Sequence, residues 1–305
     1  METYLVAMHL IRPYHFARLR PTGFVPYYHA IAAAGGVVCF DWEDSVQGAD
    51  AAATLKLKAT QRRRVGDLLR APELAALPLG IRLNAPGTPH YAADLQALAG
   101  GPGLHTVFVP KAEQPQVLTQ VLRELPVAVR HLVAVVETQA GMAALPALLR
   151  LPDPRLGLIA FGHCDYNLSC GHFPFFHQDS SRYWQWLAAL DAQAQAAGKQ
   201  FINSPVLQLA DAPLFGAVLH QLRALPSAAG QITLCLSQTL ACQLEVSGPT
   251  PTLRSNPAPE CACHLAGSFE RARPGNRAFA VDARRRLISP HEYAAARRLA
   301  GLSCT

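Results

Sequence analysis

Eight short apolar runs recur along the chain, separated by longer Ala- and Leu-rich stretches, and this alternation constrains the fold more than any other feature. The runs cover residues 4–10, 36–42, 79–84, 105–110, 131–137, 156–162, 200–205 and 232–237. Stretches between them, such as PQVLTQVLREL and YWQWLAALDAQAQAAG, have the apolar spacing of amphipathic helices. Apolar strands that alternate with helices pair in parallel, because helices cover both faces of the sheet.

Eight strand–helix units in about 240 residues predict an α/β fold, a (β/α)8 TIM barrel. A doubly wound open sheet is the alternative, but that fold carries a Gly-rich first turn, and the chain has no GxGxxG or Walker-type loop. The stretch 245–260 is rich in Pro, Ser and Thr and indicates a linker. We therefore expect a catalytic barrel over residues 1–243. Residues 244–305 are expected to form a linker and a C-terminal lid or arm, with a hairpin and a final helix from about His291.

The composition narrows the classes of partner. The chain has no run of about 18 apolar residues, so no membrane span is predicted. Its N-terminal stretch lacks the pattern of a secretion signal. The eight cysteines are therefore expected to be reduced thiols in the cytoplasm. The net charge is +6, but the clusters 62–64 and 284–286 have no interleaved aromatic residues, so we expect solvated faces and no nucleic-acid partner.

Polar side chains stand where six consecutive apolar runs end. Because the loops after the strands of a barrel meet at one mouth, we expect these side chains to lie together. Ionisable groups are costly in apolar strands unless they are paired or bind a ligand. The residues concerned are Asp41, Glu43 and Asp44; Arg82 and Asn84; Lys111; Glu137; Asp165; and Asn203 and Ser204.

Glu137 and Asp165 end adjacent strands, one strand–helix repeat apart. Two carboxylates that face one mouth repel each other unless a cation or a proton relieves them. An all-oxygen pair with room for water suits Mg²⁺. The pair therefore predicts a Mg²⁺ site; the alternative is that each carboxylate caps a helix or pairs with an arginine.

Three other residues are candidates for chemistry. The guanidinium of Arg82 suits bidentate carboxylate binding, or else forms a buried ion pair with Asp41 or Glu43. Lys111 is a candidate Schiff-base nucleophile, which would replace metal-dependent chemistry. His163 is a candidate general base. It begins a segment with two cysteines and two further histidines (residues 163–177), for which a soft-metal site, polar loop contacts with substrate and plain loop packing are the alternatives.

Five ordered motifs carry a resemblance to a known family: FDWEDSVQGAD, GIRLNAPGTP, VFVPKAE, VVETQAGM and IAFGHCDYN. Together they resemble the HpcH/HpaI aldolase and citrate lyase β-subunit family, nearest its citrate lyase β-like branch. The resemblance covers roughly residues 36–205.

The resemblance implies a role for each matched residue. Glu137 and Asp165 would ligate Mg²⁺, and Glu43 and Asp44 would support the water shell of the metal. Arg82 would bind the carboxylate of a 2-oxo acid or its hydroxyacyl precursor. Asn84 and Lys111 are expected to bind substrate beside them. Family members also suggest homo-oligomerisation through the C-terminal arm.

Four features depart from the family pattern, one of which is the segment ITLCLSQTLAC, where the family has a His-Pro pattern. The opening PGN-type segment that helps to hold coenzyme A is not evident, and Cys164 replaces the usual acidic residue before the metal aspartate. Family lids carry Ile-Asp where this chain has Ile288 and Ser289. In thioester lyases that aspartate is the proposed acid/base, so its replacement puts acyl-CoA cleavage in doubt.

The expected function is a Mg²⁺-dependent carbon–carbon lyase. It would cleave or condense a 2-oxo or hydroxy acid in an aldol or Claisen-type reaction, with or without a CoA thioester. A non-catalytic accessory subunit that binds metal and a 2-oxo acid is the alternative from another class. A phosphoenolpyruvate-type transferase on the same barrel is the third.

Overall fold

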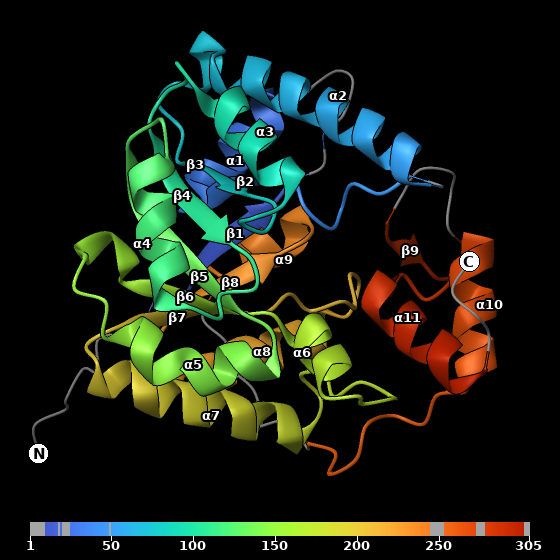
Figure 1. The fold of residues 1–305 in the computed structure, drawn as a ribbon. Coiled ribbons are helices and arrows are strands. Elements are labelled where there is room, and N and C mark those ends of the chain that lie inside the picture. Colours follow the sequence, from blue (N-terminus) through green and yellow to red (C-terminus); the bar gives the residue numbers. More distant parts are fainter. Residues whose placement is uncertain are drawn as a thin grey trace, which may run out of the picture.

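The computed structural model describes residues 10–17, 19, 25–48, 50–244, 253–272 and 278–301. Eight parallel strands close into a barrel in sequence order, with β1 paired to both β2 and β8 (Figure 1). The strands are β1 (Arg12–Phe16), β2 (Val37–Asp41), β3 (Leu79–Arg82), β4 (Leu104–Val109), β5 (Val129–Val136), β6 (Leu158–Phe161), β7 (Gln200–Asn203) and β8 (Ala228–Thr233). The predicted (β/α)8 barrel is confirmed.

Helices surround the barrel. They are α1 (Val25–Ala33), α2 (Ala51–Leu69), α3 (Pro89–Leu98), α4 (Pro115–Glu124), α5 (Gln139–Leu149), α6 (His163–Ser169), α7 (Ser181–Ala196), α8 (Ala212–Arg223) and α9 (Leu236–Ala241), with short 3-10 turns at Pro72–Leu74 and Pro154–Leu156. Side-chain caps start several of them; Asp50, for example, accepts the backbone N–H of Ala53 at the start of α2.

Two apolar layers hold the barrel together. Its interior is filled by a cluster of side chains that includes Tyr14, Cys39 and Phe108. A larger cluster lies between the strands and the helices. Alternate residues of each strand supply the two layers, because successive strand side chains point to opposite faces. The interior is therefore a packed core, and chemistry is confined to the strand ends.

The first and last strands differ from the prediction. Residues 4–9 of the first apolar run lie outside the described residues, and β1 is formed by RPYHF, whose His15 side chain bonds Thr239 outside the barrel. The last strand was predicted at 232–237, which is wrong, since β8 ends at Thr233 and α9 follows. A Cβ at Gly230 would lie 2.5 Å from the Tyr14 ring, so β8 needs a glycine there, and its opening residues Ala228–Gly230 are too small to form an apolar run in the sequence.

The C-terminal residues form an arm beside the mouth of the barrel (Figure 1). It consists of α10 (Ala262–Ala272), the hairpin of β9 (Ala280–Val281) and β10 (Leu287–Ile288), and α11 (Pro290–Leu299). It has its own apolar cluster, in which the rings of Phe269 and Tyr293 stack at 4.3 Å. The backbone N–H of Leu287 donates to the carbonyl of Leu207, which ties the arm to the loop after β7.

Two further expectations concern the surface. Among the described helices, none is both long and apolar enough to cross a membrane. Each arginine cluster contributes to internal ion pairs, because Arg62 pairs with buried Asp94 and Arg286 with buried Glu292. The division at residue 243, the oligomeric state and the cytoplasmic location stay predictions.

Candidate metal and active site

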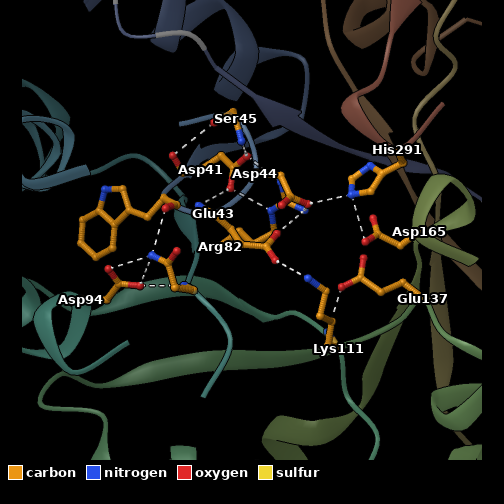
Figure 2. A network of polar contacts seen from close by, with 12 residues as sticks. Asp41, Glu43, Asp44, Ser45, Arg82, Asp94, Lys111, Glu137, Asp165 and His291 are labelled. Atoms are coloured by element: carbon orange, nitrogen blue, oxygen red, sulfur yellow. Dashed lines mark hydrogen bonds and ion pairs between the residues drawn. The ribbon is translucent and has the colours of Figure 1, made fainter. Parts of the chain in front are cut away.

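The ends of β2 to β6 bring five carboxylates to one mouth of the barrel (Figure 2). Asp41 and Arg82 are direct partners in the register of β2 and β3, so their side chains meet as neighbours. Nε and Nη2 of Arg82 donate to the two carboxylate oxygens of Asp41 at 2.8 and 2.6 Å. Burial acts against ionisation of Asp41, but Arg82 outweighs it and lowers the pKa of that carboxyl.

The remaining nitrogen of Arg82 also faces acidic groups. Nη1 lies 3.0 Å from Glu43 Oε2 and 3.7 Å from Asp44 Oδ2. Of the two interpretations of Arg82, the structure thus contains the ion pair with Asp41 and Glu43. Binding of a substrate carboxylate by Arg82 stays a prediction, because its bidentate edge is already engaged.

Glu43 is almost fully buried between these groups. Burial, together with the charges of Asp44 and Asp41, raises the pKa of Glu43 to about 8 against the opposing charge of Arg82. Its Oε1 lies 3.6 Å from Lys111 Nζ. Glu43 therefore belongs to a cluster in which carboxylates outnumber the cations that face them.

Glu137 stands at the end of β5, and only 2% of its surface is exposed. Its Oε1 accepts the backbone N–H of Lys111 at 2.8 Å, where Lys111 has the left-handed φ of 51°. Gly162 makes room for this carboxylate, because a Cβ there would lie 2.6 Å from Oε2. Burial and the charge of Asp165 raise the pKa of Glu137 well above its ordinary value.

Asp165 lies in the first turn of α6, next to the end of β6. Its Oδ1 is 3.1 Å from Nε2 of His291, and the same nitrogen is 3.6 Å from Asp44 Oδ2. His291 comes from α11 of the arm, and these three residues form the group of possible metal ligands found among the described residues. The sequence placed His291 at the start of the last helix but gave it no role.

These residues fit a divalent cation. The five carboxylates at the mouth face three basic side chains, Arg82, Lys111 and His291, so the carboxylates cannot all be ionised without a further positive charge. The raised pKa of Glu137 is the local sign of this imbalance, since its charge is opposed by burial and by Asp165. Carboxylate oxygens with space for waters are the ligands that Mg²⁺ accepts.

The predicted substrate-binding residues are placed differently from each other. Lys111 has a side chain that is 44% exposed at the mouth, and its pKa is raised by Glu43 and Asp44 although burial opposes this. The amide of Asn84 is buried and is bonded to Asp94, to the carbonyl of Trp42 and to Lys58. Asn84 therefore organises the loop after β2, with no free polar atom for a ligand.

Lys58 is a residue that the sequence analysis did not select. Its ammonium is buried and donates to the carbonyls of Trp42 and Glu43 and to Asn84, at 2.6 to 2.7 Å. Burial lowers the pKa of Lys58. Nothing in the sequence of α2 distinguishes Lys58 from its neighbours, because seven residues of that helix are charged or carry an amide and most of them face solvent.

His163 does not contact the carboxylate cluster. Its Nε2 pairs with Nδ1 of His177 at 3.0 Å, and His177 Nε2 reaches Glu292 Oε1 at 3.1 Å. Arg286 closes this chain of contacts on Glu292. Burial and His177 lower the pKa of His163 well below its ordinary value. The role of His163 as a general base stays a prediction, and the described contacts assign it to the docking of the arm.

A groove of about 450 Å³ adjoins the cluster on the side of α2 and α3. Glu43, Asp44 and Lys111 of the cluster are among its lining residues. Most of its other lining residues have polar side chains: Gln47, Asp50, Thr54, Lys58, Asn84, Thr88 and His90. The groove is thus a polar space that opens directly onto the carboxylates.

Comparisons with known proteins concern the family and the fold of the chain. A "citrate lyase subunit beta-like protein" of Mycobacterium tuberculosis is 37% identical over 128 residues, which are 42% of this chain and 40% of that protein. The match therefore spans less than half of the curated relative.

Solved structures share the fold. The citrate lyase β subunit of M. tuberculosis, complexed with oxaloacetate and magnesium, superposes with a TM-score of 0.57 at 23% identity, covering 76% of this chain and 94% of that one. A Haloferax volcanii malate synthase in a pyruvate/acetyl-CoA ternary complex gives a TM-score of 0.67 at 13% identity, covering 99% and 92%. The family model of HpcH/HpaI aldolase/citrate lyase matches residues 28–204, more than half of the chain. The chain therefore belongs to the HpcH/HpaI aldolase/citrate lyase family.

Proposed function

We propose that this protein is a Mg²⁺-dependent carbon–carbon lyase that cleaves or forms a bond next to the 2-oxo group of a small acid. The observation that carries the proposal is Glu137. Glu137 is buried beside Asp165, and because burial and the charge of Asp165 both raise its pKa, a cation bound between the two carboxylates would favour the ionised form of Glu137. Magnesium with oxaloacetate in a structural relative supports both the ion and the class of ligand.

Glu137, Asp165 and Asp44 are the oxygen ligands that would hold the ion. When bound, the cation would supply positive charge at the 2-oxo oxygen of the substrate, where negative charge develops as the carbon–carbon bond breaks. Lys111 places a half-exposed ammonium beside the ligands and would bind the substrate carboxylate. We assign proton transfer to Glu43, because it lines the groove and is not needed as a ligand.

The groove would receive the half of the substrate that leaves. Its lining of amide, hydroxyl and charged side chains favours a polar or hydroxylated fragment over an alkyl one. Ser289 favours a substrate other than a thioester. The Ser289 side chain is 1% exposed and caps α11 together with Glu292, so it does not replace the acid/base aspartate.

The positions of the strands and helices along the chain support the predicted division into a barrel and a C-terminal arm. We infer that residues 1–243 are the catalytic unit and residues 244–305 a linker and arm, since every barrel strand lies in the first part and α11 covers the mouth from the second. A homo-oligomer in the cytoplasm stays part of the proposal.

The test is turnover of the purified chain on 4-hydroxy-2-oxo acids, oxaloacetate and malyl- or citramalyl-CoA, with and without EDTA. We expect cleavage of a free acid that stops with EDTA and returns with Mg²⁺. Turnover that survives EDTA contradicts the proposal, and borohydride trapping at Lys111 would then favour a Schiff base. Binding of Mg²⁺ and a 2-oxo acid without any turnover would favour an accessory subunit instead.

Substitution tests the ligands directly. Glu137→Gln keeps the acceptor for the N–H of Lys111 but removes the charge, so we expect Mg²⁺ affinity to fall about 100-fold with the fold intact. Glu73→Gln is the control, because Glu73 is an exposed glutamate of the short turn Pro72–Leu74, away from the carboxylate cluster. Equal Mg²⁺ affinity in wild type and Glu137→Gln would contradict the assignment.

A further inference from the structure

The arm places a nitrogen ligand inside the carboxylate cluster. Nε2 of His291 faces Asp165 and Asp44 at 3.1 and 3.6 Å, as Figure 2 shows. The side chain of His291 is only 14% exposed, although it belongs to a helix outside the barrel. Three ligand atoms from three separate parts of the chain therefore meet at one place: the loop after β2, the first turn of α6 and the first turn of α11.

The position of His291 is fixed by its neighbours in the chain. Ser289 and Glu292 form a capping box that sets the first turn of α11. Glu292 bonds His177, and Arg286 bonds Glu292, so that turn is attached to the loop after α6. Because both neighbours are buried and bonded, the imidazole is held over the mouth as a built part of the site.

His291 and Asp165 form an ion pair, and the spacing of the three ligand atoms also fits a coordination shell. In an octahedron with bonds of about 2.1 Å, adjacent ligand atoms are about 3.0 Å apart and opposite ones about 4.2 Å. The two distances from His291 lie between these values, and all three atoms lie within 4.8 Å of one another. A metal ion can therefore be accommodated with small side-chain movements.

We propose that His291 is a protein ligand of the metal ion, together with Asp165 and Asp44. This inference rests on the proposed metal-dependent function. It adds a residue from the arm to a site whose other ligands all come from the barrel, so the arm completes the metal site as well as covering it.

A nitrogen ligand changes which ion the site prefers. Imidazole suits transition ions, whereas carboxylates and waters suit Mg²⁺. We therefore expect Mn²⁺ to bind at least about ten times more tightly than Mg²⁺, with His291 as the cause of most of the difference. Activity supported by either ion is compatible with this.

The experiment measures Mn²⁺ and Mg²⁺ affinity of the full chain by calorimetry, for wild type, His291→Ala and Asp165→Asn. His220→Ala is the matched control, since His220 is an exposed histidine at the end of α8. Pulsed electron paramagnetic resonance of bound Mn²⁺ reports a coupled ¹⁴N nucleus directly. Circular dichroism of His291→Ala shows whether α11 is retained.

We expect His291→Ala to weaken Mn²⁺ about tenfold or more, to affect Mg²⁺ less, and to abolish the ¹⁴N coupling that wild type and His220→Ala show. Unchanged or tighter Mn²⁺ binding in His291→Ala would overturn the inference, because His291 would then be a bystander or a competitor for the carboxylates. If Asp165→Asn still loses metal in that case, the proposed function stands. Absence of metal binding by wild type would overturn both.

Discussion

The backbone N–H of Lys111 donates to Oε1 of Glu137 across the ends of β4 and β5, at a residue held with φ of 51°. A left-handed non-glycine residue costs of order 1 kcal/mol and persists only when its surroundings impose it. Here it turns an N–H toward a buried carboxylate and the ammonium of the same residue toward Glu43. One strained residue thereby orients both a ligand and a cation of the site.

Gly162 allows the Glu137 carboxylate to reach the mouth. In Gly162→Ala the new Cβ would lie 2.5 Å from Cβ of Glu137, so that side chain must move. We expect Mg²⁺ affinity to fall at least about tenfold, which corresponds to about 1.4 kcal/mol. Calorimetric titration measures it.

Gly157→Ala is the control for this change. Gly157 stands just before β6, with its nearest neighbour, a carbonyl of Pro154, at an ordinary 3.4 Å. Its affinity should equal that of wild type. Equal affinity in both variants would show that Gly162 is not needed to position Glu137.

Lys58 stabilises the loop that carries Glu43 and Asp44. Lys58→Met removes a donor from three buried acceptors and leaves Oδ1 of Asn84 without one, whereas the Trp42 and Glu43 carbonyls keep the N–H groups of Asn84 and Val46, so we expect a loss of about 2 kcal/mol in the free energy of unfolding. Urea denaturation measures it. Lys56→Met, at an exposed position of the same helix, should change stability by less than about 0.5 kcal/mol. Similar losses in the two variants would contradict the role given to Lys58.

Glu292 makes the arm sensitive to acid. Burial opposes its ionisation, but His177 and Arg286 outweigh this and lower the pKa of Glu292 to about 2, from 4.5. A carboxyl whose pKa is lower in the folded state than in the unfolded state stabilises the fold at any pH above its unfolded pKa. This stabilisation is lost as the pH falls toward the folded pKa. Glu292 should thus contribute about 3 kcal/mol above pH 4.5, lost progressively down to about pH 2.

The measurement is the free energy of unfolding of wild type minus that of Glu292→Gln, followed from pH 6 to about pH 2. The difference should shrink across this window. Glu270→Gln, an exposed glutamate of the same arm, controls for the loss of one charge. A difference that stays constant with pH would mean that the Glu292 carboxylate is not stabilised by its partners.

The barrel and most of its mouth were predictable because their signals are local. Runs such as VVCFD and LIAF are buried on both faces and read directly as parallel strands. Arg82, Glu137 and Asp165 follow their strands closely, so topology alone brings them to one mouth. The strand of small residues, β8, carries little apolar signal, and for that reason its position was wrong.

His291 was out of reach for a different reason. The pattern Ser289–Pro290–His291–Glu292 predicts the start of a helix, and α11 begins there. What the helix docks against depends on the pairing of Glu292 with His177 and of Leu287 with Leu207. These contacts join distant parts of the chain, and no periodicity in one sequence encodes them. The same holds for Asn84, whose side-chain amide is fully hydrogen-bonded because Lys58 and Asp94, from other parts of the chain, contact it.

Two consecutive residues of α11 face different partners: His291 reaches the barrel mouth, and Glu292 reaches His177. Neighbouring residues of a helix point about 100° apart. A rotation of α11 about its axis would therefore break at least one of the two contacts. The arm can thus seat in a single orientation, whatever route the backbone takes to reach it. A barrel and an arm supplied as separate polypeptides should recognise each other and rebuild the same mouth.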